Sequence, residues 1–318
     1  MIQPLNYTTK AIGSLRRLYL DGSPSTREDI GHILDLLGKA EVFVLPDHGQ
    51  LLNREKPYPE VPPTMFRPPF PVTAIEYQAS SEGARAHHDY YTAAPCPRRI
   101  ALAFDIAPMG GLPEGGCGVA SIAYFAEHDR WIPISGAVVI PYDGEWTDRL
   151  RPLPFQAAMI EAKSISQKVA ASRTMRMDII PIWRDAWAAA EASLGGDGAI
   201  DTLSADLMDE VNAFRDLCLT LSCKNVRAER HAASRLLNKA RNKRSKPPLK
   251  DFHILTIDGQ SEIGSGGGIG QGSNRRSHLR RGHIRRLSAD RVTWVNATIV
   301  SGQGGFVDKA YRVGARPC

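Results

Sequence analysis

Four segments rich in β-forming residues follow one another in the first half of the chain, and their spacing restricts the fold more than any other feature. They are residues 72–78 (VTAIEYQ), 99–106 (RIALAFDI), 119–125 (VASIAYF) and 131–140 (WIPISGAVVI). Strands of this composition, broken by Gly, Pro and charged turns, favour an antiparallel meander. The spacing is too tight for crossover helices, which argues against a doubly wound fold.

A helix and a short strand are predicted ahead of these segments. Ser25 and Glu28 have the spacing of a capping box, and the amphipathic run that follows them stops at Gly38. Residues 41–45 (EVFVL) have the composition of a strand. Residues 57–71 contain seven prolines, so an extended connector is expected there.

The middle of the chain has helical periodicity. Helices are expected over residues 156–171 and around Trp183 and Trp187, and the strongest pattern steps by three or four through Leu203, Leu207, Val211, Phe214, Leu217 and Leu221. Asp201 and Thr202 are the candidate caps of that helix. The sequence therefore predicts an α+β protein, with an antiparallel β-meander, a helical middle and a small basic C-terminal module.

Charge is divided unequally along the chain. Residues 1–238 hold 24 Lys/Arg and 29 Asp/Glu, whereas residues 239–318 hold 16 and 5, so a net charge of −5 is followed by one of +11. Phosphate contacts release counterions, so a segregated basic region indicates a polyanionic partner, most often nucleic acid. The alternative is a solvated tail that keeps the protein soluble.

The basic region begins with a run at residues 239–246 (KARNKRSK), which includes Lys243 and Arg244. The run continues from a helix predicted over residues 227–237, and a strand is predicted over residues 251–257. Both lysine and arginine can bind phosphate, so Lys243 and Arg244 are candidate nucleic-acid ligands.

A glycine-rich stretch at residues 264–273 (GSGGGIGQGS) is predicted to be a flexible linker, because so much glycine makes ordering costly. Its glycines do not have the spacing of a phosphate-binding loop. We therefore divide the chain into an α+β core at 1–200, a helical segment with the basic run and one strand at 201–260, and the linker with a basic motif module at 261–318.

The densest signal is the cluster RRSHLRRGHIRR, which no acidic residue interrupts. Arginine forks match phosphate oxygens and stack on bases, so the cluster suits RNA better than a lysine run would. Its candidate nucleic-acid ligands are Arg275, Arg276, His278, Arg280, Arg281, His283, Arg285 and Arg286. Residues 291–300 (RVTWVNATIV) follow as a strand that would present the charges rigidly.

The two histidines of the cluster allow two interpretations. His278 and His283 could act as an acid and a base in RNA cleavage, because imidazoles titrate near pH 7. They could equally be hydrogen-bond donors to RNA. No catalytic role is assigned, because catalysis requires an orienting partner that the sequence does not identify.

Other polar residues give no recognisable site. Glu76 and Asp105 could approach one another on adjacent strands, but strands commonly carry carboxylates on their wet face. Three short polar groups, Asp47-His48, His87-His88-Asp89 and His128-Asp129, are interpreted as loop residues. No zinc, Walker, serine-hydrolase or EF-hand motif occurs, so neither a metal nor another cofactor is expected.

The sequence predicts neither a membrane span nor a secretory signal, because it lacks an apolar run of about 18 residues and a basic N-terminal segment before an apolar stretch. Its five cysteines have an odd count and irregular spacing, which is typical of reduced thiols. We expect a cytoplasmic protein.

The sequence RSHLRRGHIRR, followed closely by RVTWVNATIV, resembles the C-terminus of the type V-A anti-CRISPR family whose member lowers the messenger RNA of the CRISPR effector nuclease during translation. The matching positions are Arg276, His278, Arg280, Arg281, Gly282, His283 and Trp294. Ser277 stands where the family has proline, Ile284 stands where it usually has an aromatic residue, and residues 301–318 extend beyond the strand. The specific similarity covers about 30 residues.

The resemblance implies a protein of a phage or another mobile element that recognises the nascent N-terminal polypeptide of a nuclease and triggers decay of its message. We therefore expect a host-defence antagonist that acts in the cytoplasm of a bacterial host through translation-coupled depletion of an mRNA. The expected partner is RNA or a ribosome–nascent-chain complex. The resemblance leaves open whether the protein cuts RNA itself or recruits a host nuclease, and we favour the second. The alternatives are an endoribonuclease that uses His278 and His283, and an RNA- or DNA-binding regulator without a defence role.

Overall fold

The computed structural model describes residues 4–52, 54, 60–79, 96–147, 157, 160, 161, 167 and 173–257. Toward the C-terminus it describes the backbone of five strand segments, 276–280, 283–288, 291–295, 298–300 and 304–306. The candidates Arg275 and Arg281, the loop residues His87-His88-Asp89 and the glycine-rich stretch 264–273 lie outside the described residues.

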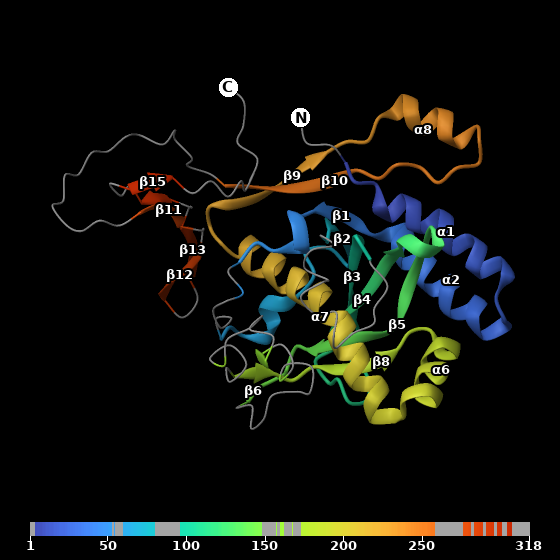
Figure 1. The fold of residues 1–318 in the computed structure, drawn as a ribbon. Helices are drawn as coiled ribbons and strands as arrows, with labels where there is room; N and C mark the ends of the chain where they lie inside the picture. Colours follow the sequence, from blue (N-terminus) through green and yellow to red (C-terminus); the bar gives the residue numbers. More distant parts are fainter. Residues whose placement is uncertain are drawn as a thin grey trace.

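An eight-stranded mixed sheet forms the centre of the protein, which is of the α+β class (Figure 1). The strand order is β8-β5-β4-β3-β2-β1-β10-β9. The strands are β1 (Glu41–Val44), β2 (Val72–Gln78), β3 (Arg98–Ile106), β4 (Gly116–Phe125), β5 (Arg130–Pro141), β8 (Asp178–Pro181), β9 (Val226–His231) and β10 (Phe252–Ile257). Strands β2 to β5 pair antiparallel in chain order, whereas β1 runs parallel to both β2 and β10.

Two helices cover one face of the sheet. These are α1 (Tyr7–Asp21) and α2 (Pro24–Lys39), whose side chains Leu15, Ile30 and Leu37 are fully buried. They pack against alternate residues of the strands, such as Ile100 and Ile122, in one hydrophobic cluster. Alternation along each strand sends the remaining apolar side chains to the other face.

The opposite face is covered by the long helix α7 (Gly196–Leu221), which crosses the sheet in Figure 1. Phe214 and Leu217 of α7 are buried there with Phe43, Ile75 and other strand residues. A shorter helix, α6 (Arg184–Leu194), precedes α7. The apolar stripe of α7 was predicted from its period, but the helix begins at Gly196, so Asp201 and Thr202 lie inside it and do not cap it.

Helix α7 and two further strands, β9 and β10, belong to this same core. Helix α7 packs on strands β3, β4 and β5, and β10 lies between β1 and β9 in the central sheet. The helix predicted over residues 227–237 is wrong, because residues 226–231 form β9, and only the shorter helix α8 (Arg235–Asn242) follows. Six residue pairs join β9 to β10, and this pairing overrides the local helical pattern.

The connections hold short elements. They contain the 3-10 turns Asp47–Gly49, Pro63–Phe66 and Ala126–His128, and the two-residue strands β6 (Trp146–Thr147) and β7 (Thr174–Met175), which pair with one another. Most of the helix expected over residues 156–171 lies outside the described residues. The N-cap of α2 is Ser23 rather than Ser25: its hydroxyl accepts from Thr26 N at 3.1 Å.

Five short strands follow near the C-terminus. They are β11 (Arg276–Arg280), β12 (His283–Ser288), β13 (Arg291–Val295), β14 (Thr298–Val300) and β15 (Gly304–Phe306). Strand β11 lies between β14 and β15, whereas β12 pairs only with β13 among the described strands. The strand predicted over residues 291–300 therefore corresponds to β13 and β14.

Candidate nucleic-acid interface

The most basic described segment lies between β9 and β10. We call residues 232–250 the basic arm; it contains seven Lys/Arg and no Asp/Glu. Figure 1 shows that the arm projects beyond the end of the β9–β10 ribbon, with α8 at its outer part. Because β9 and β10 belong to the central sheet, both ends of the arm are anchored in the core.

Asp251 closes the base of the arm. Its carboxylate accepts from Ala233 N at 2.8 Å and from Arg230 Nη2 at 2.6 Å. The hydrogen bond from the Ala233 backbone, with help from the Arg230 guanidinium, lowers the pKa of Asp251. Arg230 and Asp251 therefore fix where the chain leaves β9 and returns to β10.

The segment that leads from α8 back to β10 (residues 247–250), which we call the returning segment, is also bound to the N-terminal helices. Thr9 of α1 donates its hydroxyl to Pro248 O at 3.0 Å. Lys250 Nζ donates to Gly38 O and Ala40 O, both at 2.8 Å, which satisfies carbonyls at the C-terminal end of α2. Burial lowers the pKa of Lys250. Lys250 is thus a structural lysine rather than a ligand for phosphate.

Helix α8 is held against this returning segment. Asn238 Nδ2 donates to Leu249 O at 2.9 Å, and Leu249 N donates to Asn238 Oδ1 at 2.7 Å. One turn later, Arg241 Nε donates to Pro247 O at 2.7 Å. The hydroxyl of Ser234 caps the helix by accepting from Leu237 N at 3.3 Å. The arm is therefore a structured element and not a loose basic tail.

The remaining cations of the arm face solvent. The exposed side chains are Arg235, Lys239, Lys243, Arg244 and Lys246. None of the five forms an ion pair within the part of the chain that the structure describes. Lys243 and Arg244 follow α8 directly, so the structure places these two predicted ligands on the outer end of a rigid support.

The other predicted ligands lie elsewhere. Arg276, His278 and Arg280 are in β11, while His283, Arg285 and Arg286 are in β12. His278 pairs with Val300 and His283 with Val295, so strand pairing does not join the two histidines. In Figure 1 these strands and α8 lie at opposite ends of the β9–β10 ribbon. The arm and the arginine-rich strands are therefore two separate basic regions.

Glu76 and Asp105 do not form a site. Glu76 pairs with Ile100, which belongs to the cluster under α1 and α2, whereas Asp105 pairs with Cys117, which belongs to the cluster under α7. The two carboxylates therefore lie on opposite faces of the sheet. Asp105 accepts a hydrogen bond from Tyr142 Oη at 2.5 Å. Burial of Tyr142, followed by this hydrogen bond, raises the pKa of that tyrosine.

Glu76, which is far from α1 in sequence, instead provides a hydrogen-bond acceptor at the N-terminus of this helix. Its Oε1 accepts from Thr8 N at 2.7 Å, in the first turn of a helix whose N-cap, Asn6, provides no side-chain hydrogen bond. A carboxylate near a helix N-terminus is favourable. Burial nevertheless raises the pKa of Glu76, against the effect of the Thr8 hydrogen bonds.

A second buried carboxylate joins α7 to the sheet. Glu210 Oε1 accepts from Tyr77 Oη at 2.8 Å and from Arg99 Nη1 at 3.1 Å. Burial raises the pKa of Glu210, and the positive charge of Arg99 opposes this effect. The three residues come from α7, β2 and β3, so their contacts fix the helix on the strands.

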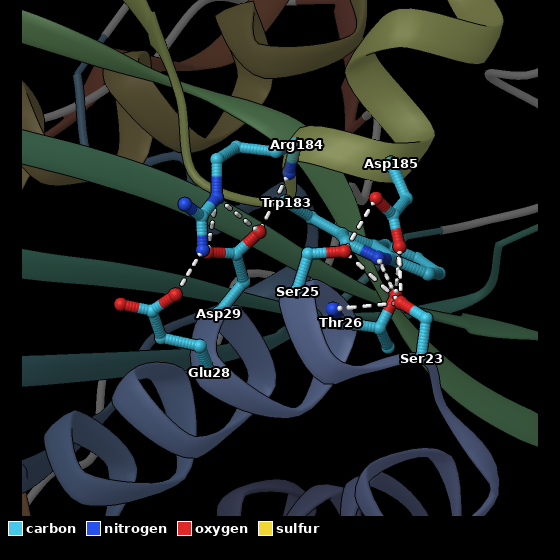
Figure 2. Close-up of polar contacts among 8 residues, drawn as sticks. All are labelled: Ser23, Ser25, Thr26, Glu28, Asp29, Trp183, Arg184 and Asp185. Atoms are coloured by element: carbon cyan, nitrogen blue, oxygen red, sulfur yellow. Dashed lines mark hydrogen bonds and ion pairs between the residues drawn. The ribbon is translucent and has the colours of Figure 1, made fainter.

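Polar contacts that no sequence pattern predicted dock α6 on α2. Figure 2 shows the Asp185 carboxylate facing three hydroxyls of the first turn of α2. Ser23, Ser25 and Thr26 donate to it at 2.6, 2.7 and 2.7 Å. The hydrogen bond from Ser23, followed by those from Ser25 and Thr26, lowers the pKa of Asp185 to about 2.

Beside these contacts, Arg184 binds the acids of α2. Arg184 Nε lies 3.0 Å from Asp29 Oδ1, its backbone N–H donates to Asp29 Oδ2 at 2.8 Å, and Nη2 lies 2.5 Å from Glu28 Oε2 (Figure 2). These three residues and His32 are the polar part of the lining of a pocket of about 470 Å³, whose other lining residues are apolar. Because Arg184 is paired with both acids, it is not free to bind an anionic ligand there.

Within the described residues, no group of three His, Cys, Asp or Glu side chains could hold a metal ion. No described helix is both long and apolar enough to cross a bilayer. The search of family models, curated proteins and solved structures found no match to this chain.

Proposed function

We propose that the protein binds RNA through the basic arm. The observation that carries this proposal is the set of five exposed cations on a hydrogen-bonded support that contains no acidic residue. An arm of this kind keeps its charges unneutralised and close together, so a polyanion gains from several contacts at once. The contacts of Asn238 and Arg241 favour binding because the support is ordered before RNA arrives.

Charge predicts how this binding depends on salt. If each of the five exposed cations contacts a phosphate, log K should fall with log salt at a slope of about −3.5 for a single strand. The arginine-rich strands β11 and β12 supply further cations in the same chain, so a steeper slope would indicate that both regions engage.

The resemblance of the C-terminal motif supports a wider proposal. RNA binding then serves host-defence antagonism, in which a ribosome–nascent-chain complex is engaged in the bacterial cytoplasm and a target mRNA is depleted during translation. The support consists of residues that match the family motif position by position, Arg276, His278, Arg280, Arg281, Gly282 and His283, and of Trp294 in the following segment. Transcript profiling in a host that carries a candidate target would test this step, and unchanged target mRNA would count against it.

The RNA-binding proposal is tested with the full chain and a fluorescent oligoribonucleotide. We expect Lys239→Ala, Lys243→Ala and Arg244→Ala together to weaken binding by about ten- to a hundredfold at low salt, and to reduce the salt slope by about 2. The three residues are exposed and make no ion pair among the described residues, so circular dichroism should stay unchanged.

The matched control removes exposed positive charge outside the arm. Arg16 and Arg17 lie on α1 and are exposed, so Arg16→Ala plus Arg17→Ala reduces the net charge without touching the arm. Little change in RNA affinity is expected. The control removes two charges and the arm variant three, so equal losses per charge removed would show that net charge alone attracts RNA. Wild-type protein that binds no RNA at low salt would refute the proposal.

A further inference from the structure

Two leucines of the basic arm lie in solvent. Leu236 is 81% exposed and Leu237 is 56% exposed, and Leu236 is the most exposed large apolar residue in the described part of the chain. Neither belongs to the two hydrophobic clusters of the core. Single exposed leucines are ordinary on a protein surface, but two adjacent ones on a short basic helix are not. These leucines therefore indicate a binding surface.

The hydrogen bonds of α8 determine where these leucines lie. Asn238 and Arg241 bind the returning segment, so they define the inner face of the helix. Residues of a helix advance about 100° each, which places Leu236 with Lys239 and Lys243 on the outer face. Leu237 lies about 100° around the helix from Leu236, on the side toward Arg241, and is still 56% exposed. The solvent-facing surface of α8 therefore combines two leucines with the cations Lys239 and Lys243.

The hydrogen bonds that order the arm do not involve the leucine side chains. Ser234 caps α8, and Asn238 and Arg241 bind it to the returning segment. The exposed apolar area is thus available for a ligand. That ligand must offer both phosphates for Lys239, Lys243 and Arg244 and apolar surface for the leucines.

We propose that the arm binds unpaired nucleotides of RNA, with Leu236 and Leu237 packed against the faces of unstacked bases. This inference rests on the proposed RNA-binding function and specifies its substrate class. In A-form duplex RNA the base faces are stacked on one another, and the wide groove presents edges, ribose hydroxyls and phosphates. Leucine gains little from those polar groups. Single strands, loops and bulges expose the base faces that an apolar side chain can cover.

The size of α8 fits a short contact. Eight residues span about 12 Å, so the helix covers a few nucleotides rather than a long groove. Arg235 precedes the leucines in α8 and Lys239 follows them, and Lys243 and Arg244 come directly after the helix. We therefore expect binding to depend on unpaired nucleotides that are bordered by phosphates and to have little base specificity.

The test compares one 12-nucleotide RNA as a single strand and annealed to its complement, by fluorescence anisotropy with the full chain. We expect Leu236→Ala plus Leu237→Ala to weaken single-strand binding by about tenfold and to change duplex binding by less than about twofold. Alanine preserves helix propensity, and circular dichroism would check that the fold is intact. The control is Leu20→Ala plus Leu194→Ala, exposed leucines on α1 and α6, which should leave both affinities unchanged.

The outcomes separate this inference from the function on which it rests. If the Lys239, Lys243 and Arg244 substitutions weaken RNA binding but the leucine substitutions do not, the arm binds RNA and the inference is wrong. Equal losses for single strand and duplex would also overturn it. Binding of the wild-type protein to anionic lipid vesicles that is lost in the leucine variant, with RNA binding unchanged, would assign the leucines to a membrane surface instead. Absence of RNA binding would overturn both proposals.

Discussion

Asn238 and Leu249 hold one another through two reciprocal hydrogen bonds, with the Asn238 amide donating at 2.9 Å and accepting at 2.7 Å. They join α8 to the segment that returns to β10. Eleven positions apart in sequence, these residues close the arm into one ordered unit. The proposed ligand surface depends on this closure, because it sets which side of α8 faces outward.

The first prediction follows from that pair. Asn238→Ala removes both hydrogen bonds, each of which contributes about 0.5–1.5 kcal/mol. We expect the amides of α8 to exchange hydrogen faster, while the strands of the core keep their protection. RNA affinity should fall several-fold, because the arm must then order on binding. Hydrogen exchange and anisotropy measure the two effects.

Asn242 provides the matched control for this change. It lies on the same helix and is exposed, and no side-chain hydrogen bond of Asn242 is found among the described residues. Asn242→Ala should leave both the exchange rates and the affinity close to wild type. If Asn238→Ala and Asn242→Ala behaved alike, the reciprocal pair would not be what orders the arm.

The second prediction concerns Glu76 at the N-terminus of α1. Glu76→Ala leaves the Thr8 N–H without its acceptor and should lower the free energy of unfolding by about 1–3 kcal/mol. Glu76→Gln should cost less, because an amide oxygen can still accept from Thr8. Thermal or denaturant unfolding at pH 7 measures both.

Glu76 also predicts the sign of a pH effect. Burial raises the folded-state pKa of Glu76, so the folded state binds its proton more tightly than the unfolded state does. The stability that this carboxyl contributes is therefore fully present below the unfolded pKa of about 4.3 and is lost as pH rises through the folded pKa. The difference in unfolding free energy between wild type and Glu76→Gln should shift in favour of Gln as pH rises through this window. A constant difference from pH 4 to 7 would contradict the assignment.

Elements of the fold could be predicted from the sequence where neighbouring residues carry the signal, and were missed where a distant contact does. The segment at 72–78 was predicted with the bounds that β2 has, because a run of β-formers begins directly after Pro71. Helix α1 was missed. Its N-cap Asn6 has a left-handed conformation, with φ 57°, and the carboxylate that accepts from its first turn comes from Glu76, 68 positions away. No local sequence pattern predicts such a cap.

The basic arm was predicted in part. The charge run led to Lys243 and Arg244, but the leucines at 236 and 237 were included in a predicted helix that begins at residue 227. The pairing of β9 with β10 overrides that pattern, and it is a contact between segments about 25 residues apart. The exposure of Leu236 and Leu237 follows from this pairing and from the contacts of Asn238, so sequence alone could not show it.

The third prediction addresses the arginine-rich strands. Arg280 ends β11 and pairs with Thr298, and Arg281 follows it in sequence. We expect Arg280→Ala plus Arg281→Ala to reduce RNA binding and target mRNA depletion while circular dichroism and melting temperature stay unchanged. If the melting temperature fell markedly, these arginines would be structural. Combining the variant with the arm variant should add the two losses, because the two basic regions are separate.

The last prediction decides between a binder and an endoribonuclease. We expect wild-type protein not to cleave RNA without metal, and His278→Gln and His283→Gln each to cost at most about 1–3 kcal/mol of RNA affinity, the value of a lost hydrogen bond. No Asp or Glu occurs between Asn274 and Ala289 to orient either imidazole. Strand pairing does not join the histidines either, since β11 and β12 belong to different sheets.

The assays are RNA binding and metal-free RNA cleavage by wild type and both variants from about pH 5 to 9, the range in which imidazoles titrate. A positioned general acid or base contributes a factor of about 10² to 10⁴ to the rate. If either histidine is catalytic, its replacement by Gln should lower the rate of RNA cleavage by about a hundredfold or more, while RNA binding is retained. A bell-shaped cleavage profile in the wild type that disappears in both variants would therefore establish the endoribonuclease. Cleavage that persists equally in both variants would instead show that neither imidazole is the acid or the base, and the His278–His283 mechanism would be wrong.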